Sequence, residues 1–365
     1  MMLVLTLCPQ DNLSKELWGY ARAFRRHGIA LSCVSANTPP DVHIDDLLSA
    51  CPARPDFVWS PDSDFCCMPH GLTEVDIPTV CFQFDTYNNT SRRILWSTLF
   101  DIPVLFHPGF EQMYRDAGHA HPLTLAHAAQ SDFYDVEIDE KTTDLGWVGQ
   151  VRGAPYATRK RILPRLAREF RMNDWATHYT LEQTADIYRQ SKIVLNVSRD
   201  DYPQDANMRV FEAMAAGALL ITSLPSNLIA LGFTEGEHFV GYERGEDIAK
   251  RIQHFLNDEE SRLRIAQAGR QLVLDRHTYD TRVESLVHFI SMYGNKFSAP
   301  ARRKRLEEVR LMHLDYYTSM FNMRSAFREL GWLASHDVRC AAKGAYLIGR
   351  AQIRQSLNQV QQLLK

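Results

Sequence analysis

Short apolar segments alternate with amphipathic segments along most of the chain, and this order strongly limits the folds that are possible. The first 36 residues contain one full cycle: apolar LVLTL, then DNLSKELWGYARAFRRHG, then apolar IALSCVSA. The middle segment begins with capping residues, repeats apolar positions at helical spacing and ends in basic residues and Gly28. Strand, helix and strand in this order predict a right-handed βαβ unit with parallel strands, so the expected fold class is α/β.

The alternation continues through the first half of the chain. Further strands are predicted from DFVWS, PTVCFQF, IPVLFH and LTLAH, and helices between them from segments such as SRRILWSTLF and GFEQMYRDAG. No Gly-x-Gly-x-x-Gly sequence follows the first strand, which excludes an NAD-type fingerprint. A polar, acidic stretch, QSDFYDVEIDEKTTD, then precedes a second alternating series, and we interpret this stretch as an interdomain linker.

The second series repeats the strand and helix pattern. It opens with LGWVGQVRG and continues into the helical segment YATRKRILPRLAREF, in which Pro164 can kink or interrupt the helix. In the next helical segment, LEQTADIYRQS, Thr180 and Gln183 have the spacing of a capping box. The series is completed by the strand KIVLNVS, the segment NMRVFEAMAAGALLIT, the strand HFVGY and helices from Glu246 to about Asn295.

The remaining residues are mainly helical in pattern. Apolar residues at positions 306, 309, 312, 316, 320, 323 and 327 have an amphipathic spacing. The basic start of this segment can contact a membrane surface or an anionic partner. The alternative is a solvated face on a helix that packs back on the body of the protein.

The composition excludes several classes of protein. With 41 Lys and Arg against 44 Asp and Glu, the formal net charge is −3, so there is no overall basic field for nucleic acid. The N-terminal run MMLVLTLCPQDN has no basic n-region, and no later run approaches ~18 apolar residues, so we expect a cytoplasmic protein without a membrane span. The seven cysteines form no Cys-x-x-Cys pair, which favours reduced thiols over a zinc site or a disulfide framework.

The segment NMRVFEAMAAGALLIT places an Arg and a Glu near the start of a helix. Asn207 is a suitable N-cap, and the unpaired N–H groups that follow it form an anion site suited to phosphate. The Glu212 carboxylate, about one turn further, can accept two hydrogen bonds from a ribose diol, and Arg209 can add a charged contact. The alternative is an ordinary ion pair on a surface helix. Asn196 and Ser198 end the preceding strand, at the edge of a parallel sheet where ligands bind.

Several segments in the second half, taken together in order and spacing, resemble a known family. Residues 144–288 are similar to the C-terminal domain of GT-B glycosyltransferases of the group 1, family 4-like type, and most of all to the branch named after spore-maturation glycosyltransferases. The segments that carry this resemblance are LGWVGQ, YATRKRIL, IYRQSKIVLNVS, NMRVFEAMAAGALLIT, FTEGEHFVGYERGEDIAKRIQHFLNDEESRLRIAQAGRQLV and HTYDTRVESL.

The resemblance implies a fold, a set of domains and a donor. It implies two Rossmann-like, doubly wound parallel-sheet domains facing across a cleft, with residues 1–140 on the acceptor side and 141–290 binding the nucleotide sugar. Residues 291–365 would form a helical extension. Family members carry two Glu residues separated by seven residues; Glu212 matches the second, which contacts the ribose, but Gln204 stands where the first is expected.

The family holds the donor diphosphate with basic side chains and a helix N-terminus. The matching candidates here are Arg152, in the loop after Gly149, and Arg159, in the Tyr-x-x-Arg position. The complete set expected at the donor site is Glu212, Arg209, Asn207, Met208, Gln204, Arg152, Arg159, Gly149, Asn196 and Ser198. The family is generally independent of metal, so we expect no metal site and no cofactor beyond the nucleoside diphosphate sugar, which is a co-substrate.

The first half resembles the family only loosely. Asp85 follows one predicted strand and His107 another, and these two are the catalytic candidates, because either side chain can act as a base. The alternative for each is a structural role. His127 lies near the linker, and Asp11 and Asn12, after the first strand, more readily cap the first helix than line the acceptor site.

The expected function is transfer of a sugar from a nucleoside diphosphate donor to an acceptor hydroxyl, with retention implied by the resemblance alone. The expected partners are a nucleotide-sugar donor and an unidentified acceptor, without nucleic acid. Two alternatives stay open: a nucleotide-sugar epimerase of the same architecture, and a non-catalytic module that binds a sugar nucleotide or a glycan.

Overall fold

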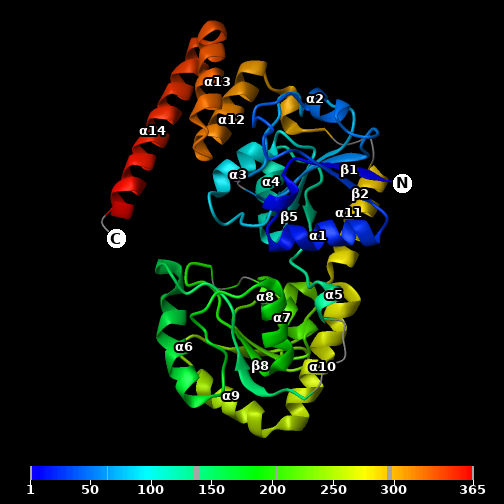
Figure 1. Ribbon diagram of the computed structural model, residues 1–365, viewed down its shortest axis with the longest axis vertical. Coiled ribbons are helices and arrows are strands. Elements are labelled where there is room, and N and C mark those ends of the chain that lie inside the picture. Colours follow the sequence, from blue (N-terminus) through cyan, green and yellow to red (C-terminus); the bar gives the residue numbers. More distant parts are fainter. Residues whose placement is uncertain are drawn as a thin grey trace. The chain divides into compact units, whose positions relative to one another are not determined.

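Two parallel sheets, one in each of two units, form the framework of the computed structural model (Figure 1). The structure describes residues 2–63, 65–134, 140–202, 204, 206–293 and 298–363. The first unit consists of residues 1–17, 24–125 and 288–365, and the second of residues 18–23 and 126–287. The α/β class with parallel strands is therefore confirmed.

The first unit contains a six-stranded sheet in the order β2-β1-β3-β4-β5-β6, with every neighbouring pair parallel. Central strands β1, β3, β4 and β5 are fully buried because helices cover both faces of a parallel sheet. The strands are β1 (Leu3–Thr6), β2 (Ala30–Cys33), β3 (Phe57–Ser60), β4 (Thr79–Gln83), β5 (Ile102–Leu105) and β6 (Leu123–Thr124).

Helices follow most of these strands, as the sequence pattern predicts. Those in the N-terminal part are α1 (Lys15–Arg26), α2 (Ile44–Ser49), α3 (Thr90–Ser97) and α4 (Glu111–Asp116). Short 3₁₀ segments, η1 (Gln10–Asn12) and η2 (Pro108–Phe110), occupy the turns after β1 and β5. Asp11 and Asn12 thus lie in η1, and α1 begins only at Lys15, so the prediction that these two residues cap the first long helix is wrong.

The second unit contains a four-stranded parallel sheet in the order β10-β9-β8-β7. Its strands are β7 (Thr143–Gly146), β8 (Ser191–Asn196), β9 (Leu219–Ser223) and β10 (Val240–Tyr242). The helices that begin in it are α5 (Ser131–Tyr134), α6 (Ala157–Glu169), α7 (Leu181–Gln190), α8 (Met208–Ala215), α9 (Ile248–Asn257), α10 (Glu259–Arg276) and α11 (Tyr279–Tyr293), with 3₁₀ segments η3 (Ala154–Tyr156) and η4 (Ile229–Leu231).

The two helix caps predicted from the sequence of this unit are confirmed. Thr180 and Gln183 exchange both hydrogen bonds of the capping box at the start of α7. The Asn207 side chain accepts a hydrogen bond from the Arg209 N–H and so caps α8. Helix α6 continues through Pro164 without interruption. Part of the interpreted linker, residues 135–139, lies outside the described residues, and Ser131–Tyr134 within it forms α5.

The C-terminal helices are α12 (Leu306–Ser319), α13 (Met323–His336) and α14 (Val338–Leu363), preceded by the 3₁₀ segment η6 (Pro300–Arg303), and Figure 1 shows the three long helices packed together. The amphipathic spacing does not describe them well. Phe321 has a left-handed backbone (φ 55°), which separates α12 from α13, and Asn322 caps the latter. Helix α12 is buried at every position from Met312 to Thr318, not on one face.

A polar network joins these helices to the rest of the first unit. The buried Asp315 carboxylate on α12 accepts hydrogen bonds from Arg92 (2.9 Å) and from the Trp96 indole (3.0 Å) on α3. The fully buried Glu329 carboxylate on α13 pairs with His70 and Arg310. Buried charges require partners of this kind, so the C-terminal helices are an integral part of the first unit.

Within the described residues, no helix combines the length and apolar composition of a membrane span. Nor does the described part of the chain contain a group of three or more His, Cys, Asp or Glu side chains able to hold a metal ion.

Candidate functional site

The candidate donor site lies at the carboxyl edge of the sheet in the second unit. Strands β7, β8 and β9 are parallel and adjacent, so the loops that follow Gly146, Asn196 and Ser223 emerge from the same edge. Ligands of open parallel sheets bind at such an edge. Helix α8 begins there as well, because its capping residue Asn207 donates a hydrogen bond from Nδ2 to Asn196 Oδ1 (3.2 Å).

Asn196 connects three elements at this edge. Its fully buried side chain donates from Nδ2 to Thr222 Oγ1 on β9 (2.8 Å), and its Oδ1 accepts from Asn207 and from Arg209 Nη1 (2.6 Å). Tyr242 donates its hydroxyl to the Asn196 carbonyl (3.2 Å). Because every one of these contacts is buried or half-buried, the start of α8 has a fixed position relative to the strands.

Arg209 joins α8 to the loop after β7. Its Nε donates to the Val148 carbonyl (2.6 Å), and its guanidinium lies over the Trp147 ring at 5.4 Å. The side chain is half-buried. A cation held in this way beside a helix N-terminus reinforces the positive potential that favours an anion there.

Gly149 is required by the position of Arg209. A Cβ at residue 149 would lie 2.1 Å from Arg209 Nη2, and this nitrogen cannot move away easily while its guanidinium is bonded to Val148 and Asn196. The loop therefore needs a glycine at position 149, because the Arg209 guanidinium approaches its backbone closely. Gly149 was predicted from the sequence as a residue of the donor site.

We expect Gly149→Ala to destabilise the protein by about 1–3 kcal/mol, the usual cost of overpacking a fixed contact. Thermal or denaturant unfolding measures this change. In an Arg209→Ala background the same substitution should reduce the free energy of unfolding much less, because Arg209 Nη2, the atom that the new Cβ would clash with, is absent. Equal costs in the two backgrounds would show that the 2.1 Å approach does not determine the choice of glycine.

Arg159 braces the loops of the site from within the protein. It is 4% exposed, and its guanidinium donates to the carbonyls of Val197 and Gln150, both at 2.8 Å. The Tyr156 ring lies 4.5 Å from the same group. These contacts connect the loops after β7 and β8, and the contact between Arg159 and a diphosphate stays a prediction.

Arg152 has a different environment. Its side chain is exposed, while its backbone N–H donates to Gln150 Oε1 (2.8 Å), which holds the loop in a turn. The exposed guanidinium lies in the same loop as Gly149, so Arg152 is the candidate with a charge that faces solvent.

Glu212 is buried, so it does not belong to an exposed ion pair on the helix surface. It is 3% exposed, and its carboxylate acts on two buried tyrosines, Tyr134 and Tyr188. Burial is the main cause that raises the pKa of both phenols, and the nearby carboxylate raises them further. The carboxylate is thus held in a largely dehydrated place on α8, where a hydrogen bond to a ligand hydroxyl would be strong.

The remaining predicted donor residues divide into two groups. Met208 and Ser198 are buried, and Ser198 Oγ accepts from Ser223 Oγ (2.9 Å). Gln204 is exposed, and its carbonyl accepts from the Asn227 N–H (2.9 Å). The residue in the position of the missing carboxylate therefore differs from Glu212 in its exposure to solvent.

Trp147 was not among the residues predicted from the sequence. Its ring is fully buried beneath both Arg159 and Arg209, at 5.9 and 5.4 Å, and its indole nitrogen has no hydrogen-bond partner in the described parts of the chain. An aromatic residue directly after an apolar strand, in LGWVGQ, was the available signal. The guanidinium groups of both arginines thus pack on the Trp147 ring.

The catalytic candidates of the first unit lie at one edge of its sheet. Gln83 of β4 pairs with Leu105 of β5, and Asp85 and His107 each follow two residues later. Asp85 is exposed and accepts a hydrogen bond from the Tyr87 hydroxyl (3.0 Å). His107 Nδ1 accepts from the Gly109 N–H (3.0 Å), which places the proton of the neutral ring on Nε2.

His127 belongs to the second unit, whereas Asp85 and His107 belong to the first. It is half-buried, and its backbone carbonyl accepts from Arg282 Nη2 (3.2 Å). Asp85 and His107 therefore follow neighbouring strands at one sheet edge of the first unit, and the donor candidates all belong to the second unit.

Comparison with known proteins adds a family match and a fold. Residues 146–288 match the model of a family described as glycosyl transferase-like. This range contains all the donor candidates, and the match agrees with the resemblance to glycosyltransferases stated from the sequence. No curated protein is significantly similar to the chain.

Solved structures resemble most of the chain. HepE from Anabaena, in complex with UDP and glucose, is 12% identical with a TM-score of 0.55, covering 80% of this chain and 100% of HepE. A glycosyltransferase from Rickettsia africae is 11% identical (TM-score 0.53; 80% and 99% covered), as is sucrose-phosphate synthase from Thermosynechococcus elongatus (0.52; 80% and 99%). At this level of identity the likeness concerns the fold, and the chain has the GT-B fold, with helices added at the C-terminus.

Proposed function

We propose that this protein transfers a glycosyl group from a nucleoside diphosphate sugar to an acceptor hydroxyl. The observation that carries the proposal is the start of α8, where Asn207, Arg209 and the loop of Gly149 converge in a domain that matches glycosyl transferase-like sequences. A helix N-terminus reinforced by a guanidinium suits a diphosphate, and Glu212 suits the ribose diol.

The donor diphosphate is the leaving group in this proposal. Negative charge grows on it as the bond to the sugar breaks, and Arg152, Arg209 and the N–H groups of α8 stabilise that charge without a metal ion. No cofactor is needed beyond the donor. UDP-sugars are the first donors to test, because HepE, with the same fold, binds UDP and glucose.

For a retaining transfer the donor diphosphate itself can accept the proton of the acceptor hydroxyl. For an inverting transfer a protein base is needed, and Asp85 is the first candidate, because its side chain is exposed and a carboxylate oxygen can accept a proton. His107, in the tautomer that its Gly109 contact favours, presents an N–H and not a lone pair.

Product analysis tests the proposal and separates it from its alternatives. The protein is incubated with UDP-, GDP-, ADP- and TDP-sugars without acceptor, and the products are identified by NMR. We expect slow release of free sugar and nucleoside diphosphate from one donor. Conversion of the donor into an epimeric nucleotide sugar would instead identify an epimerase, and binding with no product, with or without a panel of acceptors, would identify a non-catalytic module.

Three finer expectations stay predictions. They are membership of the spore-maturation branch, a cytoplasmic location, and membrane contact through the basic C-terminal segment. In that segment Arg302 donates to the Val75 carbonyl, and Arg305 pairs with Asp337 (2.9 Å), so part of the basic charge is used within the protein.

A further inference from the structure

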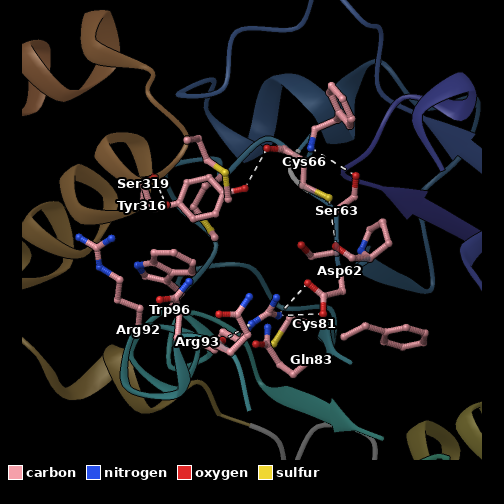
Figure 2. Close-up of a pocket in the computed structure, with 18 of the residues that line it drawn as sticks. Asp62, Ser63, Cys66, Cys81, Gln83, Arg92, Arg93, Trp96, Tyr316 and Ser319 are labelled. Atoms are coloured by element: carbon pink, nitrogen blue, oxygen red, sulfur yellow. Dashed lines mark hydrogen bonds and ion pairs between the residues drawn. The ribbon is translucent and has the colours of Figure 1, made fainter. Parts of the chain in front are cut away.

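The first unit contains a cavity of about 530 Å³ that includes none of the donor-site residues. Its walls come from the ends of β3 and β4, from α3, and from the C-terminal helices α12 and α14 (Figure 2). The volume is within the usual range of about 300–1,000 Å³ for small-molecule sites. All of its walls belong to one unit.

Gln83 gives this cavity an unsatisfied polar group. Its side chain, at the end of β4, is only 9% exposed, and its Oε1 is buried with no hydrogen-bond partner among the described residues. Burial raises the pKa of the neighbouring Cys81 thiol, and a hydrogen bond from the Gln83 side chain lowers it in part. A hydrogen bond that lowers a thiol pKa is donated to the sulfur, so it uses the amide N–H of Gln83. The carboxamide oxygen still requires a donor, such as a ligand hydroxyl or N–H.

Three arginines line the same cavity. Arg93 pairs with Asp62 through Nη1, at 2.8 Å to each carboxylate oxygen, and Arg92 pairs with Asp315 through Nη2 (2.9 Å). Arg354, on α14, is exposed and lies over the Phe321 ring at 5.7 Å. Arg92 and Arg93 are thus each paired with a carboxylate, and Asp85 also acts on Arg93. Among the described residues, the cation of this cavity that contacts an aromatic ring and not a carboxylate is Arg354, so the attraction for an anion rests mainly on this side chain.

Aromatic rings form another part of the wall. Trp96 and Tyr316 meet edge to face at 5.2 Å, and their polar atoms are turned to protein partners: Trp96 Nε1 donates to Asp315 and Tyr316 donates to the Cys66 carbonyl. Figure 2 shows both rings beside Arg92. The rings thus offer apolar surface to a ligand, whereas Gln83 and the arginines offer the groups for hydrogen bonds and ion pairs.

These properties define one class of ligand. It must donate a hydrogen bond from a hydroxyl deep in the cavity, present an apolar surface to Trp96 and Tyr316, and carry a negative charge for the arginines. A pyranose with a carboxylate or a phosphate group has all three features, since its ring has an apolar C–H face and a hydroxyl edge.

We propose that this cavity is the acceptor site and that it binds a sugar bearing a negative charge. A hydroxyl of the sugar donates to Gln83 Oε1, and its anionic group contacts Arg92 and Arg354. The assignment as acceptor site rests on the proposed glycosyl transfer, whereas the binding of an anionic sugar to the cavity does not.

The test is a titration of the full chain with D-glucuronate, D-glucose 6-phosphate, D-glucose and inorganic phosphate, followed by ligand-observed NMR. At least one anionic sugar should bind about tenfold more tightly than glucose, the scale of one charged contact. It should also bind more tightly than phosphate, because phosphate lacks the apolar ring face that would contact Trp96 and Tyr316.

Variants locate the binding. Gln83→Met keeps the length of the side chain but removes the acceptor, and should weaken the anionic sugar about fivefold or more; Gln83→Asn repeats the test if the first variant does not fold. Arg354→Glu should weaken it about tenfold. Arg350→Glu is the matched control, because this arginine lies on the same exposed helix but does not line the cavity, and it should have no effect.

Two results would overturn the inference: no anionic sugar binds more tightly than glucose, or Arg350→Glu weakens binding as much as Arg354→Glu. A parallel titration with UDP keeps the two proposals apart. If UDP binds and the sugars do not, the cavity assignment fails alone. If the anionic sugars bind as expected and no nucleotide does, the proposed transfer fails and the cavity remains a sugar site.

Discussion

Replacement of Glu212 by Gln should weaken UDP binding by about 1.5–3 kcal/mol, a loss of roughly 10- to 100-fold in affinity. The carboxylate can accept both hydrogen bonds of a ribose diol with a full charge, whereas a carboxamide offers one neutral acceptor and an unwanted donor. Gln has nearly the same volume, so the buried position on α8 is not emptied. Calorimetric titration measures the change.

Discrimination between UDP and 2′-deoxy-UDP gives this prediction a second readout. The wild type should prefer UDP, because the deoxy analogue lacks one hydroxyl of the diol, and Glu212→Gln should bind the two almost equally. Glu182→Gln, at an exposed position on α7 of the same unit, is the control and should behave as the wild type. A Glu212→Gln protein that folds, binds UDP normally and still prefers it to the deoxy analogue would exclude the ribose contact.

Arg159→Ala should reduce the free energy of unfolding by roughly 2–4 kcal/mol. The substitution removes two hydrogen bonds from a buried guanidinium to Val197 and Gln150 and leaves the space beside Trp147 empty. Denaturant unfolding measures this loss. Lys160→Ala, at the exposed neighbouring position, should stay within about 0.5 kcal/mol of the wild type.

Arg152→Ala, unlike Arg159→Ala, should reduce UDP affinity and leave the free energy of unfolding almost unchanged. Its exposed guanidinium contributes little to stability, but its loss should weaken UDP binding more than uridine binding, because only UDP carries the diphosphate. A stable Arg159→Ala protein with a selective loss of UDP affinity would reverse the two assignments and make Arg159 the phosphate ligand.

Sequence reasoning predicted the features that depend on neighbouring residues. The parallel strands, the Asn207 cap of α8 and the capping box of Thr180 all follow from side chains within a few positions of each other. It also placed the donor candidates at one sheet edge, since polar residues that end adjacent parallel strands must meet there.

Features that depend on tertiary packing could not be read from the sequence. Arg159 stands in the basic run TRKR, where all the charges look solvated, yet the phase of α6 turns this one inward while Lys160 stays exposed. Helix α12 is buried on all sides because α3, α13 and α14 surround it, which a pattern along one helix cannot reveal.

The cavity of the first unit could not be predicted from the sequence for the same reason. Gln83 lies two residues before Asp85, in a strand whose alternation predicted only burial. Gln83 and the arginines of α3 line the same cavity as Arg354, which is more than 250 residues later in the chain. Only the packing of the C-terminal helices on the first unit assembles this set.

The central claim is that the start of α8 and the loop of Gly149 bind a nucleoside diphosphate. Calorimetric titration of the wild-type chain with UDP, GDP, ADP and TDP tests it most directly. One of the four should bind with a stoichiometry of one and more tightly than its nucleoside, by an amount that falls in Arg152→Ala. Absence of binding for all four, with a folded protein, would contradict the claim.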